Sequence, residues 1–187
     1  MNISEIYNYL VRARRDLWAT LEAVPDEVLS RPLLDGEQMH CIKDLVFHIA
    51  SVEDGWTNGN ILQREPLFMN TSAFAGTRGG PEYAGFKLET LLDYWRTVEQ
   101  STLAYLETLN DDGLKRNVTD EDWQGRTQEY TVDGLLWHVM IHEMRHTAQI
   151  VVLLRTQGIK PPSLDLLFYL PSSINQPVLN EDLRNES

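Results

Sequence analysis

The sequence contains a single cysteine, Cys41, among its 187 residues. One thiol cannot form a disulfide within the chain, and it cannot supply the thiolates of a cysteine-rich zinc site. We expect Cys41 to be a small buried side chain. No run approaches the roughly 18 apolar residues that a membrane-spanning helix requires. Residues 1–10 also lack the basic and apolar regions of a signal peptide. These absences favour a cytoplasmic protein with no membrane partner.

Positive charge is also scarce. Lysine and arginine total 16 against 28 aspartates and glutamates, which gives a formal net charge of -12. An acidic surface repels nucleic-acid phosphates and anionic lipid headgroups. We therefore expect no nucleic-acid partner, and a small molecule is the expected substrate class. The composition is that of one soluble domain, which we place at residues 1–170, followed by a polar tail at 171–187.

Four segments repeat apolar residues at the spacing of one helix face. Asn2 followed by Glu5 predicts a capping box at the first helix, and Pro25 predicts its end. Thr131 is the predicted N-cap of the last helix. Four amphipathic helices without a strong strand pattern predict an all-α four-helix bundle. The apolar stripes cover residues 6–24, 42–56, 88–109 and 135–153.

Two connections between these helices are informative. Residues 57–85 are rich in glycine and proline and are too many for a tight helix–helix turn. A connection of this size can run the length of a bundle, so we expect the second and third helices to be parallel neighbours. Residues 114–130, with Gly125 near their middle, are equally compatible with a short β-hairpin and with a plain loop.

Histidines occupy positions where apolar residues are expected. His142 and His146 lie on the apolar stripe of the fourth helix, one turn apart on the same face. Two buried imidazoles are costly unless each ring nitrogen has a partner, and one metal ion satisfies both. His48, on the second helix, is the best candidate for a third ligand. Each histidine alone is more often a hydrogen-bonded core residue, but the three together favour a metal site with open coordination positions.

The two remaining histidines are weaker candidates. His40 precedes the second helix and is expected to face solvent, whereas His138 can line the pocket or form a hydrogen bond. The string His142–His146 also matches the His-Glu-x-x-His motif of zinc proteases, in which Glu143 would be the general base. No histidine follows His146, so a third protease ligand would have to be acidic, and proteolysis is disfavoured.

A di-iron carboxylate bundle is a further alternative. It would pair Glu37-x-x-His40 with Glu143-x-x-His146. This pattern leaves His48 and His142 unexplained, and it places one ligand pair at a helix entrance. We therefore disfavour it.

Two strings resemble the DinB-like (DinB/YfiT-like) metalloenzyme superfamily. They are residues 44–49 with Glu53 and Trp56 after them, and residues 136–150. The resemblance implies a four-helix bundle of up-down-down-up topology that often forms a homodimer. It also implies one divalent metal ion on His48, His142 and His146, the same three residues that the helix pattern selects. Some relatives are transferases or isomerases that use low-molecular-weight thiols.

The combined hypothesis is a divalent-metal-dependent enzyme, with thiol-dependent S-transfer to a small electrophile as its expected chemistry. Three imidazoles suit Zn or Ni, and also Fe or Cu. Glu143 is a candidate proton acceptor or a residue that supports a ligand. Arg145, beside the ligand pair, is a candidate for binding the cofactor or a substrate carboxylate. The alternatives are a metal-dependent hydrolase and a non-catalytic stress protein that carries a metal or ligand.

Overall fold

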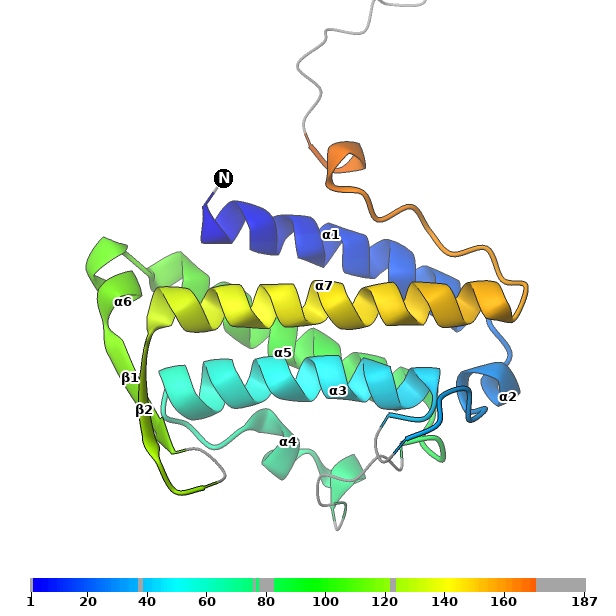
Figure 1. Ribbon diagram of the computed structural model, residues 1–187, viewed down its shortest axis with the longest axis horizontal. Coiled ribbons are helices and arrows are strands. Elements are labelled where there is room, and N and C mark those ends of the chain that lie inside the picture. The colour runs from blue at the N-terminus through cyan, green and yellow to red at the C-terminus, as the bar shows by residue number, and fades with distance from the viewer. Residues whose placement is uncertain (1, 37–38, 76, 78–82, 122–123, 171–187) are drawn as a thin grey trace, which may run out of the picture.

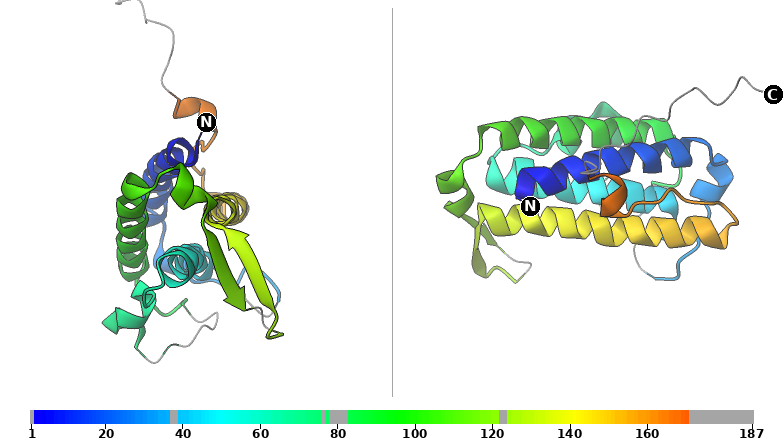
Figure 2. Two further views of the ribbon diagram at one scale, coloured as in Figure 1. Left: turned by 90° about the vertical axis from the view of Figure 1, so that its left-hand side faces the viewer. Right: turned by 90° about the horizontal axis from the view of Figure 1, so that it is seen from above.

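The computed structural model describes residues 2–36, 39–75, 77, 83–121 and 124–170. The predicted tail at 171–187 and Glu37 of the disfavoured di-iron pattern lie outside these residues. Four long helices lie side by side (Figures 1 and 2). They are α1 (Ile3–Glu22), α3 (Ile42–Asp54), α5 (Leu88–Thr108) and α7 (Val132–Thr156). The short helices are α2 (Asp26–Leu29), α4 (Leu67–Asn70), α6 (Asp111–Lys115), and the 3-10 turns η2 (Ser72–Phe74) and η3 (Leu166–Phe168).

The predicted helix starts are confirmed. The backbone N–H of Glu5 donates to the side chain of Asn2 at 2.9 Å, and the Asn2 N–H donates to the Glu5 carboxylate at 2.7 Å. These two bonds satisfy amides that have no partner within the helix. At the start of α7, the Thr131 hydroxyl accepts the N–H of Gly134 at 3.1 Å. Local sequence therefore fixes where the two helices begin.

Helices α3 and α5 run in the same direction. Near the start of both, Lys43 donates to the carbonyl of Phe86 at 2.7 Å. Beyond the end of α3, Ser101 of α5 donates to the Asn58 side chain at 2.8 Å. The contacting residues advance together along the two segments, and Figure 1 shows the same direction for the two ribbons.

The second helix extends further than the sequence predicts. It continues past Trp56 as the π-helical segment η1 (Gly55–Ile61), where Leu62 donates to the carbonyl of Thr57 at 2.9 Å. Buried Asp54 supports this segment, because its carboxylate accepts bonds from three other parts of the fold. The donors are the Asn58 amide, the N–H groups of Leu67 and Phe68, and the Tyr94 hydroxyl.

The all-α prediction needs a correction, because the chain also forms a two-stranded antiparallel sheet. Strand β1 (Asn117–Glu121) pairs with β2 (Thr127–Thr131), with Asn117 opposite Thr131. Val118 anchors the hairpin to the bundle with 2% of its surface exposed. Gly125 in the turn has a φ of +75°, a conformation that favours glycine. The fold is therefore mostly helical, and the hairpin is the correct one of the two alternatives for this connection.

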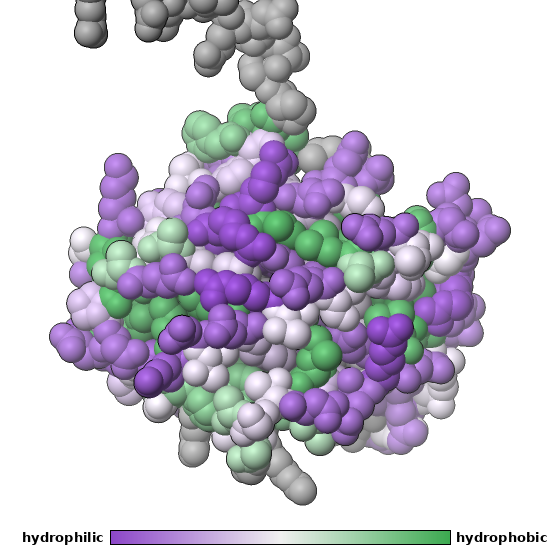
Figure 3. Space-filling view, turned by 180° about the vertical axis from the view of Figure 1, so that it is seen from behind, coloured by the Kyte–Doolittle hydropathy of each residue, from purple (hydrophilic) through white to green (hydrophobic). Residues whose placement is uncertain are grey.

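Apolar side chains fill the interior of the bundle, and hydrophilic side chains lie mainly on its surface. Trp18 and Trp95 pack edge to face inside the bundle, with ring centroids 5.4 Å apart, and Cys41 is buried. Hydrophilic residues cover most of the face opposite to that of Figure 1 (Figure 3). None of the helices in the described part of the chain has the length and apolar character needed to cross a bilayer.

Candidate metal centre

Three imidazole rings meet between α3 and α7. His48 projects from α3, and His142 and His146 project from successive turns of α7. Nε2 of His48 lies 3.1 Å from Nε2 of His142. The ring centroids of His48 and His146 are 4.7 Å apart, and one ligand atom from each of the three rings lies within 4.8 Å of the others. The structure thus brings together the three histidines that the sequence selects.

Burial keeps these rings neutral. Burial, together with the neighbouring His146, lowers the pKa of His48 to about 4 and that of His142 to about 3. Burial also lowers the pKa of His146. A neutral imidazole has a free lone pair on one ring nitrogen, which is the form that binds a metal ion. All three rings are therefore in the ligand form at neutral pH.

The orientation of His146 is set by a neighbour on its own helix. Its Nδ1 lies 2.6 Å from the side-chain oxygen of Gln149, so this nitrogen carries the proton. The other nitrogen, Nε2, is left with its lone pair, and the Arg145 guanidinium lies 3.2 Å from it. Gln149 was not singled out from the sequence. Its spacing of three residues from a candidate ligand is the signal that identifies it.

The three donors fit a divalent metal ion. A tetrahedral ion bound by nitrogens at about 2.1 Å holds those nitrogens about 3.4 Å apart. In the cluster, one pair of Nε2 atoms is 3.1 Å apart and the three ligand atoms all lie within 4.8 Å of one another, so side-chain adjustments of about 1.4 Å or less in these separations reach that arrangement. Three neutral nitrogen ligands leave the ion its full charge and at least one position for an exogenous molecule.

An aromatic wall adjoins the histidines. The ring of Trp56, from η1, packs edge-on against His138 at 5.6 Å and against Tyr130 of β2 at 6.2 Å. His138 in turn lies 5.8 Å from His142. His138 and Tyr130 are exposed, so this wall faces solvent beside the cluster. His138 therefore lies next to the three-histidine cluster without being part of it.

Glu143 lies in a different environment from the histidines. It is buried against α1, where both of its carboxylate oxygens accept bonds from Arg14, at 2.7 and 2.5 Å. Burial raises the pKa of Glu143, and the Arg14 guanidinium opposes that shift. Of the other candidates, Arg145 is exposed beside His146, and half-buried His40 contacts the carbonyl of Leu34 at 3.2 Å.

A buried ionic cluster surrounds Arg14. Glutamates from three helices, Glu53 of α3, Glu99 of α5 and Glu143 of α7, all accept hydrogen bonds from this one guanidinium. Tyr7 also accepts one, at 3.2 Å. This cluster was not predicted from the sequence. The feature that could have indicated it is the position of Arg14 on the apolar stripe of the first helix, four residues after Leu10 and three before Leu17.

The fold is shared with several bacterial proteins of known structure. A conserved protein from Enterococcus faecalis matches with a TM-score of 0.64 and 19% identity, covering 83% of this chain and 96% of that one. A DinB-like protein from Bacillus subtilis matches with a TM-score of 0.55 and 22% identity, covering 86% and 96%. One from Bacillus cereus has a TM-score of 0.53 and 18% identity, covering 84% and 94%. At these identities the likeness shows the fold alone.

None of the curated proteins matches this chain. The family model that matches is described as the DinB family, and it covers residues 1–179 of the 187. The three-histidine cluster is compatible with metal binding and lies within that range. The chain therefore belongs to the DinB family.

Proposed function

We propose that this protein is a divalent-metal-dependent enzyme that acts on a small molecule. The observation that carries the proposal is the cluster of three neutral imidazoles, His48, His142 and His146, in ligand form beside a solvent-facing wall. A divalent ion held there would lower the pKa of a coordinated thiol and make a thiolate available at neutral pH. Soft sulfur suits Zn and Ni in particular.

The arrangement of the four long helices supports the up-down-down-up topology as part of this proposal. Helices α3 and α5 are parallel, and Glu99 of α5 contacts Arg14 and Arg15 of α1 while Trp95 contacts Trp18, so α1 and α5 are antiparallel. In the same topology α3 is antiparallel to α7, and His48 of α3 contacts His142 and His146 on two successive turns of α7. The homodimer and the cytoplasmic location stay predictions.

The favoured chemistry is S-transfer from a low-molecular-weight thiol to an electrophilic carbon. The thiol loses its proton to solvent, its sulfur forms a bond to the carbon, and the leaving group departs with the electron pair of the broken bond. Arg145 is proposed to hold a carboxylate of the thiol or of the substrate, since its exposed guanidinium lies beside His146. Glu143 is assigned no proton transfer, because Arg14 already binds both of its oxygens.

Cobalt substitution tests this proposal. Untagged protein loaded with Co²⁺ is titrated with bacillithiol, mycothiol, glutathione and coenzyme A, and the expected result is a sulfur-to-metal charge-transfer band with one of them. The His142→Ala variant is the control and should give no band. The metal-loaded protein should then conjugate that thiol to electrophilic test substrates.

The other outcomes separate the alternatives. No band with any of the four thiols would contradict the transferase, and hydrolase substrates would be screened next. A band without conjugation would favour a non-catalytic carrier of a metal or ligand. Three protein ligands would leave a bound ion with open coordination positions in either case, so turnover is the measurement that decides.

A further inference from the structure

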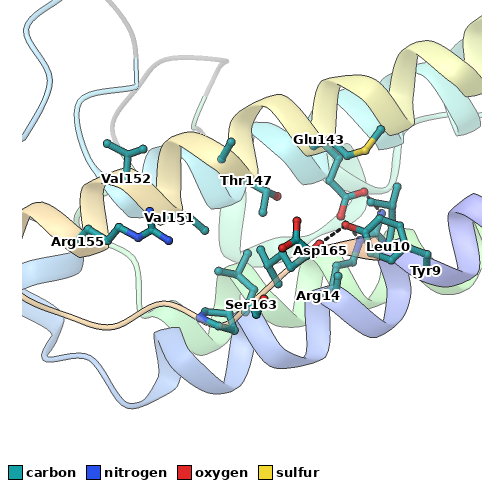
Figure 4. Close-up of a pocket in the computed structure, with 16 residues that line it drawn as sticks. Tyr9, Leu10, Arg14, Glu143, Thr147, Val151, Val152, Arg155, Ser163 and Asp165 are labelled. Carbon is teal, nitrogen blue, oxygen red and sulfur yellow. Dashed lines mark hydrogen bonds and ion pairs between the residues drawn. The ribbon is translucent and has the colours of Figure 1, made fainter. Parts of the chain in front are cut away.

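A second site lies on the α1 side of α7. A cavity of about 420 Å³ opens between α1, α7 and residues 162–165 of the segment that follows α7. Figure 4 shows its lining residues. Within the described residues, the lining includes none of the three histidines. The volume falls in the range of about 300–1000 Å³ that is typical of small-molecule sites.

The walls of this cavity are apolar. Val152 and Met144 of α7 are 56% and 37% exposed, so part of this apolar surface is open to solvent. Such a surface favours the hydrocarbon part of a ligand. The larger aliphatic side chains of the lining are Leu10, Leu17, Met144, Val151, Val152 and Leu164.

The inner end of the cavity offers hydrogen-bond acceptors. Arg14 lines the cavity, but its five N–H donors are used by Tyr7, Glu53, Glu99 and, twice, Glu143. It has no donor left for a ligand. The Glu143 carboxylate, which also lines the cavity, retains acceptor capacity because each of its oxygens accepts one bond from Arg14.

Acidic groups outnumber basic groups at this end. The buried cluster sets three glutamates, Glu53, Glu99 and Glu143, against two arginines, Arg14 and Arg15. The cluster therefore holds one more acidic group than basic groups.

A further carboxylate lies at this end of the cavity. Exposed Asp165 also lines the cavity, and Figure 4 shows it with Glu143 in the space between α7 and α1. Tyr9 belongs to the same lining, and burial, together with the nearby Glu143 and Asp165, raises the pKa of its hydroxyl. That hydroxyl donates to the carbonyl of Leu164 at 2.5 Å. Besides Arg14, the described part of the lining contains one further arginine, Arg155, whose backbone lies about 18 Å from that of Glu143 along the axis of α7.

We propose that this cavity binds a small aliphatic amine, with its ammonium group against Glu143 and Asp165 and its carbon chain against the apolar walls. An ammonium group donates up to three hydrogen bonds and brings a positive charge to a place where acidic groups outnumber basic groups. A carboxylate ligand would meet two acidic groups and no available Arg14 donor at the same place.

Calorimetric titration of the metal-loaded, full-length protein tests the proposal with hexylamine, hexanol and hexanoate. These probes share a carbon chain and differ in charge. Hexylamine should bind about tenfold or more tightly than hexanoate, with hexanol between them. The Asp165→Asn variant should weaken hexylamine about threefold to fivefold and leave hexanol unchanged, as expected for one exposed ion pair. Glu107→Gln, an exposed glutamate on α5, is the charge-matched control.

A second pair of variants tests the location. Ala148→Phe places a ring in the cavity from an exposed position of α7, and it should abolish binding of hexylamine and hexanol. Ala104→Phe makes the same change at an exposed position of α5 and should bind both probes normally. The proposal is wrong if hexanoate binds as tightly as hexylamine, if none of the probes binds, or if Ala148→Phe binds like the parent. Metal content, measured in every sample, keeps this result separate from the proposed function.

Discussion

Nε2 of His48 lies 3.1 Å from Nε2 of His142, although the two residues are 94 positions apart in the chain. The contact exists because α3 and α7 pack side by side with the two rings at the same level of the bundle. His146, one helical turn after His142, is the third member of the cluster, and its ring centroid lies 4.3 Å from that of His142. This relationship is the basis of the proposed metal site.

Replacing any one of His48, His142 and His146 with alanine should reduce bound metal to well under half occupancy. Two nitrogen ligands do not hold a divalent ion as firmly as three. Metal analysis of protein purified without an affinity tag measures the effect. His40→Ala is the control and should keep full occupancy, because His40 contacts the Leu34 carbonyl outside the cluster. The ligand assignment fails if His40→Ala empties the site and His48→Ala does not.

Gln149→Leu should weaken metal binding about tenfold to a hundredfold, as expected for loss of a partner that orients a ligand. The Gln149 side-chain oxygen lies 2.6 Å from His146 Nδ1 and directs Nε2 toward the cluster. Competition with a chromophoric chelator measures the affinity. Gln100→Leu, at an exposed position of α5, should have no effect. Equal affinities for the two variants would show that Gln149 does not orient the ligand.

Arg14→Met should destabilise the protein by about 3–5 kcal/mol, because it leaves three buried glutamates without their shared counter-charge. Urea unfolding followed by circular dichroism measures the free energy of unfolding. Arg12→Met is the matched control on the same helix, where the side chain is exposed, and it should change stability by less than about 0.5 kcal/mol. Similar stability for the two variants would mean that the buried cluster does not hold the helices together.

Cys41 should react slowly with thiol reagents in the folded protein. Burial raises the pKa of its thiol to about 11, so at pH 8 the thiol is protonated and the reactive thiolate is scarce. Its reactivity should rise with pH up to about 11 and should reach that of a free thiol at pH 8 once urea unfolds the chain. Alkylation with iodoacetamide, followed by mass spectrometry, measures both rates. Fast labelling of the folded protein at pH 8 would contradict the buried placement.

Local sequence predicted the parts of the structure that depend on near neighbours. The capping box of Asn2 and Glu5, the N-cap at Thr131 and the four apolar stripes all correspond to observed features. Each of these signals acts within one or two helical turns, so it can be read without knowledge of the fold. The π-helical extension after α3 was missed because it depends on Asp54, whose partners include Leu67, Phe68 and Tyr94.

The sequence by itself determined that His142 and His146 share one helix face, and it indicated His48 as the third member of the cluster. Only the tertiary structure decided that Glu143, next to His142 in the chain, accepts hydrogen bonds from Arg14 of α1 and lines a separate cavity. The physical reason is that adjacent residues of a helix project about 100° apart, so they meet different neighbours. Which helix lies on each side of α7 depends on packing between segments far apart in sequence.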